Sequence, residues 1–288
     1  MSAGPDAAPT LQPPTEPGRR ARRAAARKQA AGRRRVSVIG VFGELLITAG
    51  ALVLAFIGWQ LWIGDTLIGD QLEKQAAEQS EAWNEAARQS PPPTPDGTDE
   101  PDDPTVDADP QPPVEVAPAN AVPFGRLLVP RWGSDYLRPI AEGVGVSDVL
   151  NKGELGHYPS TQMPGELGNF AIAAHRTTKG GSLHRIHELQ LGDHIYVETA
   201  AGWYQYSFRN LEYVRASGVG VLDPVPQTAG AVPSESYITL TSCNPILTSV
   251  ERIIAYGVYD RFYPRDPSKP AAGAPEEIAP TVIQAAGV

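Results

Sequence analysis

Cys243, the only cysteine in the chain, stands in the stretch TLTSCNP. Period-two alternation places its side chain on the same strand face as Thr239 and Thr241. Pro245 then breaks the strand, because proline has no backbone N–H to donate. Arg252 opens a second apolar run, and antiparallel pairing across the loop would bring its guanidinium to the thiol. A cation beside a thiol favours the reactive thiolate and can stabilise an oxyanion.

The same spacing also allows a purely structural interpretation. In it, Cys243 packs as a small apolar side chain and Arg252 covers the rim with its aliphatic stem. One Cys and one Arg nine residues apart do not decide between the two interpretations. A single cysteine does exclude a disulfide within the chain.

A thiolate that expels an amine also needs an acid to protonate that amine. His175 ends the apolar run GNFAIAAHR, so we expect its imidazole at a strand end. His157, in GHYP, is the competing histidine, although the neighbouring Pro159 favours a structured loop near the site. His184 and His187 could share a metal, but no third ligand stands out, so we predict neither a metal nor a cofactor.

Residues 121–264 carry the pattern of one β-rich domain, with short alternating runs separated by Gly, Pro and Asp turns. We expect strands at residues 126–132, 169–175, 193–199, 203–214, 237–243 and 252–262. Helical turns are expected near residues 147–152 and 182–189. Since a closed barrel leaves no exposed strand edges, the expected fold class is all-β, a barrel with short helices.

Five further stretches flank this domain. Residues 1–35 contain nine Lys and Arg and predict a disordered basic cytoplasmic arm. Residues 36–63 are apolar and long enough for a transmembrane helix across about 30 Å of hydrocarbon. Residues 64–89 are rich in helix formers and predict a helical stalk. Residues 90–120 contain ten Pro and eight Asp or Glu and predict a disordered acidic linker that spaces the domain from the membrane. Residues 265–288 predict a disordered tail.

The charges around the apolar stretch predict its orientation. Glu44 would be costly at the bilayer centre, so we place it at the inner interface and Trp59 and Trp62 at the outer one. A cleaved signal peptide is the alternative, but no small-residue cleavage site follows Trp62. Nine basic residues precede the apolar stretch, whereas Lys74 and Arg88 are the only basic residues between residues 64 and 125. We therefore expect a cytoplasmic N-terminus and an extracytoplasmic domain.

The net charge of −9 argues against nucleic acid as a partner.

Several motifs taken together resemble the sortase family, whose signature is TLxTC, a following Arg and an earlier His. Here they are TLTSC at residues 239–243, the RIIAYG strand that begins at Arg252, and AAHR at residues 173–176. The stretches LGHYP, MPGELGNFAIAAHRTT and TLTSCNP are most similar to the class E subgroup. Ser242 replaces the usual Thr on the face opposite the thiol, so we expect only a local change in packing.

This resemblance covers residues 121–264 and implies an eight-stranded barrel that carries out transpeptidation outside the membrane. Cys243 would attack the Thr–Gly carbonyl of an LPxTG-like sorting signal on a surface protein, or LAxTG for class E. His175 would protonate the glycine amine, and Arg252 would stabilise the oxyanion or position the signal. An amino group of a cell-wall precursor would then release the thioacyl enzyme. Tyr158 and Thr241 are candidates for the signal groove, with ordinary barrel packing as the alternative.

Two other function classes remain open. Cys/His transpeptidases that act on D-amino-acid stems also use one extracytoplasmic thiol, but their Gly and Ser pattern around the Cys is absent here. A non-catalytic, membrane-tethered β-domain that binds a wall polymer or a partner protein is the second alternative. For such a domain, replacing Cys243 by Ala would change packing alone.

Overall fold

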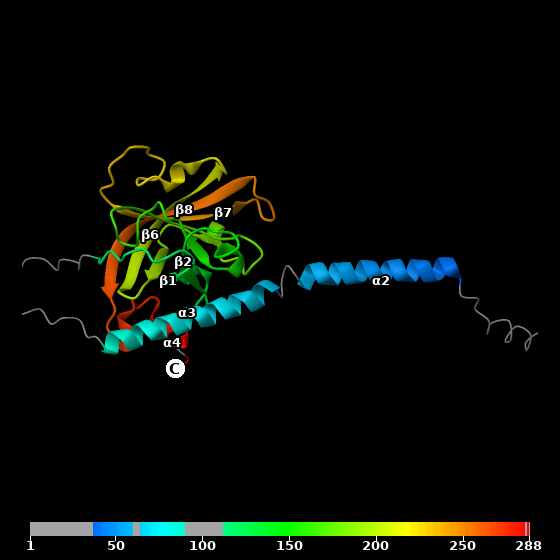
Figure 1. Cartoon of the computed structure of the whole chain (residues 1–288), viewed down its shortest axis with the longest axis horizontal. Coiled ribbons are helices and arrows are strands. Elements are labelled where there is room, and N and C mark those ends of the chain that lie inside the picture. The colour runs from blue at the N-terminus through cyan, green and yellow to red at the C-terminus, as the bar shows by residue number, and fades with distance from the viewer. Residues whose placement is uncertain (1–36, 60–63, 90–111, 286, 288) are drawn as a thin grey trace, which may run out of the picture. The chain divides into compact units, whose positions relative to one another are not determined.

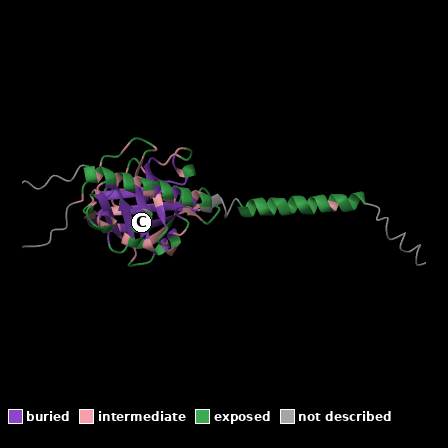
Figure 2. Ribbon diagram, turned by 90° about the horizontal axis from the view of Figure 1, so that it is seen from below, coloured by how far each residue is buried: buried purple, intermediate pink, exposed green. Residues whose placement is uncertain are grey.

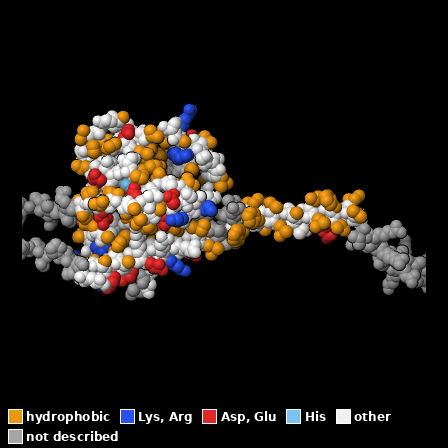
Figure 3. Space-filling view, in the orientation of Figure 1, with side chains coloured by type: hydrophobic (Ala, Val, Ile, Leu, Met, Phe, Trp, Pro, Cys, Tyr) orange, Lys and Arg blue, Asp and Glu red, His pale blue; other side chains and the backbone are white. Residues whose placement is uncertain are grey.

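The computed structural model describes residues 37–59, 64–89, 112–285 and 287, in two compact units covering residues 1–55 and 56–288. The predicted basic arm at 1–35 and most of the predicted acidic linker fall outside the described residues. Helix α2 (Val38–Gly58) has 21 residues, enough by length and composition to cross a membrane. Its side chains are mostly apolar (Figure 3), apart from Glu44 and Thr48, and are exposed along nearly all of the helix (Figure 2).

The second unit contains eight strands that close into a barrel in the order β1-β2-β3-β4-β7-β8-β6-β5 (Figure 1). The strands are β1 (Pro123–Leu128), β2 (Leu137–Glu142), β3 (Leu155–His157), β4 (Gly168–Ala173), β5 (His194–Glu198), β6 (Gly202–Arg215), β7 (Ser236–Asn244) and β8 (Glu251–Pro264). Neighbours pair antiparallel except β2 with β3 and β4 with β7, which are parallel. The predicted all-β barrel is confirmed.

The barrel interior follows the alternation seen in the sequence. Ile195 and Val197 of β5 and Tyr204 and Tyr206 of β6 point into one buried core. Each of the six expected strands is present, although 3₁₀ helix η2 (Pro130–Trp132) replaces the end of the first. The sequence does not reveal β2 or β3, because β2 contains Pro139, which argues against a strand, and β3 has three residues, too few to show a period.

The predicted helix over residues 64–89 is present as α3 (Gly64–Gln89), and it packs against the barrel. Leu72, Ala76, Ser80 and Asn84 recur every four residues and are all buried. Their spacing places them on one helical face, and Figure 1 shows α3 running along the barrel beside α4. The charged residues on the other faces of the helix mask this contact in the sequence.

The C-terminal segment is also ordered on the barrel, which corrects the predicted disordered tail at 265–288. It forms η6 (Pro270–Gly273) and α4 (Ala279–Ala285). Together with α3 it covers a second core on the outer face of β1, β2, β5 and β6, made of Ala76, Leu128, Leu137, Tyr196, Trp203, Ala272, Ile278 and Val282. Most of β1, β2 and β5 and the first half of β6 are therefore buried on both faces.

The end of the predicted linker also lies on the barrel. Tyr204 donates its hydroxyl hydrogen to the Pro113 carbonyl at 2.6 Å. Burial raises the pKa of Glu115, which bonds to Thr199 and to the backbone of Ala201. Residues 112–120, at the end of the predicted linker, thus belong to the unit that contains the barrel. Residues 90–111 lie outside the described residues, so the spacer stays a prediction there.

A buried carboxylate ties α3 and the C-terminal segment to the barrel. Glu198 is fully buried and forms ion pairs with Arg126 and, at 2.6 Å, with Arg265. Ser80 of α3 donates its hydroxyl hydrogen to the same carboxylate at 2.6 Å, and Arg265 also bonds to Asn84. Burial alone would raise the pKa of Glu198, but the two guanidinium groups outweigh it and hold that pKa below its usual range.

Replacing Glu198 by Gln removes the negative charge that Arg126 and Arg265 share. Because both cations then stay buried without a counter-charge, we expect the free energy of unfolding to fall by about 3–5 kcal/mol. Urea unfolding of the full chain, followed by tryptophan fluorescence, measures the loss. Asp193→Asn is the control, since it breaks a pair with the exposed Arg131 and should cost far less. Equal losses in the two variants would contradict this account of Glu198.

Candidate active site

The β7–β8 pairing brings Cys243 to Arg252. These two residues are direct partners in the antiparallel ladder, at the end of β7 and the start of β8. Cys243 is partly exposed, as is Arg252. The thiol is therefore not sealed in the barrel interior, and the residue across the ladder from it carries a permanent positive charge.

The β4–β7 pairing brings His175 to the same rim. The two strands are parallel, with Ala173 opposite Thr241, and the Ala174 amide continues the ladder by donating to the Thr241 carbonyl at 3.2 Å. His175 and Cys243 each lie two residues beyond this last pair, so continuing the same register would align them. Because strands β4, β7 and β8 are neighbours in that order, the three predicted catalytic residues lie on adjoining strand ends.

The surroundings of His175 favour a neutral imidazole. Burial lowers the pKa of His175, and the charge of Lys179 lowers it further. The ring Nε2 lies 3.0 Å from the Asn151 side-chain oxygen. An amide oxygen can only accept, so Nε2 carries the proton and Nδ1 keeps the basic lone pair of the neutral ring.

Arg252 is held by the loop between the two strands. Its Nη1 donates to the carbonyls of Ser249 and Glu251, both at 2.9 Å. A guanidinium has five N–H donors, and these two bonds share one nitrogen. The Arg252 guanidinium is thus anchored at the rim, and its other N–H groups can donate hydrogen bonds to an anion.

Arg176 is a residue of this site that the sequence reasoning did not identify. Its Nη1 donates to the Asn244 side-chain oxygen at 2.6 Å and to the Cys243 carbonyl at 3.4 Å. The amide nitrogen of Asn244 in turn donates to Glu251 at 3.2 Å. Arg176 is 6% exposed, and burial lowers its pKa. This network connects the ends of β4, β7 and β8; its one sequence signal is the Arg that follows His175 in AAHR.

Tyr158 and Thr241, the two candidates for the signal groove, contact each other. Their hydroxyl oxygens lie 3.2 Å apart, and Thr241 also donates to the Ile172 carbonyl at 3.3 Å. Thr241 is 4% exposed, whereas Tyr158 is partly exposed. Thr241 shares the strand face of Cys243, two residues away, so Tyr158 lies over the same face as the thiol.

His157 and His184 have structural partners. His157 is 1% exposed; its Nδ1 lies 2.7 Å from Glu142, and its Nε2 lies 3.1 Å from the Thr161 hydroxyl. This closed environment removes it as the competitor of His175. His184 bonds through Nδ1 to the Arg176 carbonyl at 3.1 Å. Across the part of the chain that the structure describes, no three His, Cys, Asp or Glu side chains gather into a metal site.

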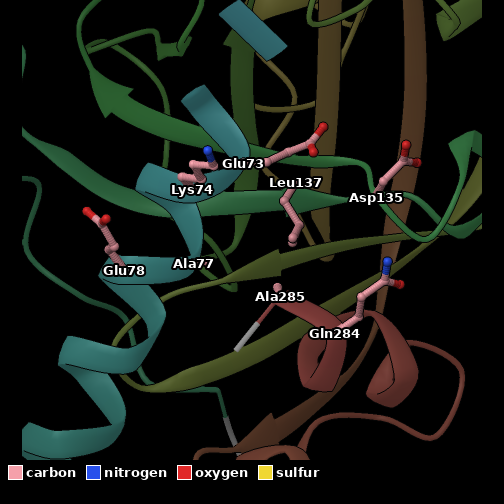
Figure 4. Close-up of a pocket in the computed structure, with 8 residues that line it drawn as sticks. All are labelled: Glu73, Lys74, Ala77, Glu78, Asp135, Leu137, Gln284 and Ala285. Atoms are coloured by element: carbon pink, nitrogen blue, oxygen red, sulfur yellow. The ribbon is translucent and has the colours of Figure 1, made fainter. Parts of the chain in front are cut away.

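A separate pocket of about 310 Å³ lies between α3, β2 and α4 (Figure 4). Glu73, Lys74 and Glu78 line it from α3, Asp135 and Leu137 from the region of β2, and Gln284 from α4. The residues around it come from the side of the barrel that α3 covers, whereas Cys243 lies at the end of β7. The candidate active site is therefore the rim formed by β4, β7 and β8, and not this pocket.

The chain matches known proteins over this same barrel. The family model for the sortase domain matches residues 127–260. Sortase SrtE1 of Streptomyces coelicolor is 34% identical over 259 residues, covering 87% of this chain, which spans 66% of that protein. Sortase SrtE2 of the same organism is 30% identical over 232 residues, covering 78% of this chain and 83% of that protein.

Solved structures give the same assignment. The sortase SrtA of Actinomyces oris is 39% identical, covers 58% of this chain and 93% of its own, and has a TM-score of 0.53. Sortase E1 of Streptomyces coelicolor, solved with a tripeptide in the active site, is 36% identical, covers 55% of this chain and 97% of its own, and has a TM-score of 0.50. The chain therefore belongs to the sortase family and is class E-like.

Proposed function

We propose that this chain is a membrane-anchored cysteine transpeptidase. In this proposal it cleaves an LPxTG- or LAxTG-like sorting signal between Thr and Gly and transfers the protein to an amino group of a cell-wall precursor. The observation that carries the proposal is the pairing of β7 with both β4 and β8: Cys243 is the ladder partner of Arg252, and His175 follows two residues after the last β4–β7 pair, Ala173 and Thr241. Membership of a family of cysteine transpeptidases supports the reaction class.

In the first step the neutral His175 imidazole takes the thiol proton of Cys243, and the resulting thiolate attacks the carbonyl carbon of the signal threonine. The carbonyl oxygen becomes an oxyanion, which the Arg252 guanidinium stabilises as a charge-assisted donor. The C–N bond to glycine then breaks, and the His175 imidazolium donates its proton to the departing amine. A thioester between Cys243 and the threonine carbonyl remains.

In the second step an acceptor amine attacks the thioester carbon. His175, now neutral, takes the proton that the amine loses, and the thiolate of Cys243 leaves. The low pKa of His175 suits this base role, because burial keeps the ring unprotonated until a proton is released. The same imidazole therefore acts as an acid toward the departing amine in the first step and as a base toward the acceptor amine in the second.

Tyr158 is our candidate for a direct contact with the signal, because its partly exposed ring lies on the face that carries the thiol. Thr241 is too buried for such a contact without movement of Tyr158. We assign Thr241 the task of fixing the Tyr158 hydroxyl through their 3.2 Å hydrogen bond. Helix α2 is the proposed membrane anchor, which would leave the N-terminus in the cytoplasm and the barrel outside.

Incubation of the full chain, in detergent micelles, with a peptide that contains LAxTG tests the proposal. We expect mass spectrometry to detect the peptide acyl group on Cys243 and fluorescence to report cleavage of the Thr–Gly bond. Cys243→Ala should abolish both signals while the melting temperature stays close to that of the parent chain. Turnover by the Ala variant, or no adduct on the parent chain, would favour the non-catalytic binding domain. An LPxTG peptide in competition measures the signal preference.

Lys179 provides a test of the pKa of His175. Lys179→Gln removes a positive charge that disfavours the imidazolium, so the pKa of His175 rises and the imidazolium persists to higher pH. We expect the ratio of kcat/KM at about pH 8 to that at about pH 6 to increase, since these values bracket the ordinary histidine pKa. Lys179→Arg keeps the charge and should leave the ratio unchanged. A lower ratio in the Gln variant would contradict the assignment.

A double-mutant cycle tests whether Arg176 acts through Asn244. Arg176→Met and Asn244→Ala each release the end of β7, and we expect each to lower kcat by about 10-fold or more, because small displacements of reacting groups are costly. If the two residues act as one unit, the double variant loses no more than Arg176→Met alone. Losses that simply multiply would show that Arg176 acts on its own. Arg185→Met, which frees the main-chain carbonyls of Trp132 and Arg131, serves as the control.

A further inference from the structure

We propose that Ile68 and Leu72, in the first turns of α3, are positioning residues for the imidazole of His175. They pack against two loops, one carrying Asn151 and the other following His175. The inference rests on the proposed function, because it assigns these side chains to the transpeptidation site. It goes beyond the barrel itself, since α3 precedes the sortase domain at residues 127–260.

Two glycines allow α3 to approach these loops closely. Gly153 and Gly180 both have positive φ, of 90° and 86°. A Cβ added to Gly153 would lie 2.7 Å from Leu72 Cδ1, and one added to Gly180 would lie 2.9 Å from Ile68 Cγ2. These are closer than a methyl group tolerates, so the two apolar side chains rest directly on the backbone of both loops.

Each loop leads from that contact to the candidate catalytic histidine. Gly153 donates its N–H to the Leu150 carbonyl at 3.0 Å, which closes the 3₁₀ turn η3 (Leu150–Lys152) around Asn151. Asn151 in turn holds Nε2 of His175. Gly180 lies five residues after His175, on the stretch that folds back so that the Leu183 amide donates to the His175 carbonyl at 3.2 Å.

The two loops are also bonded to each other and to α3. Ser182, which is buried, donates its hydroxyl hydrogen to the Gly153 carbonyl at 2.5 Å, and Tyr136 donates to the Ser182 carbonyl at 2.6 Å. Gln75, one turn after Leu72, bonds to Glu154 at 3.3 Å. The loops thus form one packed unit with the start of α3, and a shift of that helix end displaces both partners of the His175–Asn151 hydrogen bond.

The far end of α3 is attached independently. Ser80 and Asn84 bond to the Glu198 and Arg265 network, and Arg265 also lies 5.5 Å from the centre of the Trp83 ring. That end packs on β5 and the C-terminal segment, not on the loops of His175 and Asn151. Contacts at the start of α3 can therefore be removed while the helix stays on the barrel, which makes the positioning role separable from overall stability.

The test compares Ile68→Ala and Leu72→Ala with Trp83→Ala in the full chain in micelles. All three remove apolar contacts of α3 and should lower the melting temperature. For the first two we expect kcat with the LAxTG peptide to fall by between about 10- and 100-fold, with KM within about two-fold of the parent value. We also expect the pKa of His175, followed by NMR of labelled histidine rings, to rise toward its ordinary value as water reaches the loosened loops. Trp83→Ala should leave kcat and this pKa unchanged.

Two results would overturn the positioning role. One is a parent-like kcat and histidine titration in Ile68→Ala and Leu72→Ala despite their lower melting temperatures. The other is an equal loss of kcat in Trp83→Ala, which would make the effect one of general stability. Failure of the proposed function is distinguishable, because it shows as no turnover and no thioester in the parent chain, whereas the histidine titration still reports on positioning.

Discussion

Strand β7 pairs with β4 on one side and β8 on the other, and the candidate site depends on this arrangement. Because β4 and β7 are parallel, their C-terminal ends meet; because β7 and β8 are antiparallel, the end of one meets the start of the other. Cys243 and Arg252 are consequently ladder partners, and His175 follows the adjoining end of β4. A one-residue slip of β7 would turn the thiol to the opposite face and separate the three side chains.

Positive charge is concentrated at this rim of an otherwise acidic chain. Arg252 lies across the ladder from Cys243, Arg176 bonds to the Cys243 carbonyl, and Lys179 lowers the pKa of His175. The two arginines differ in their surroundings. Arg176 is buried and committed to fixed acceptors, which suits it to holding the strand end, whereas Arg252 is partly exposed and suits contact with a developing oxyanion.

The folded unit is larger than the barrel alone, because the outer face of β1, β2, β5 and β6 is apolar and needs a cover. Helix α3 and the C-terminal segment provide it, and Glu198 bonds to both of them. Helix α3 and residues 265–285 are therefore part of the same folded unit as the barrel.

The sequence by itself determined the elements with strong local signals. Alternating apolar residues identify β5 and β6, an uninterrupted apolar run identifies α2, and the motifs around His175, Cys243 and Arg252 identify the family. These patterns can be recognised from the sequence alone because they depend on residues that are close together along the chain. The packing of α3 and of residues 265–285, the burial of Glu198 and the bonds of Arg176 were decided only by tertiary structure. Their partners lie far away in the sequence, and a charged or Pro-rich stretch looks the same whether it is solvated or covers a core.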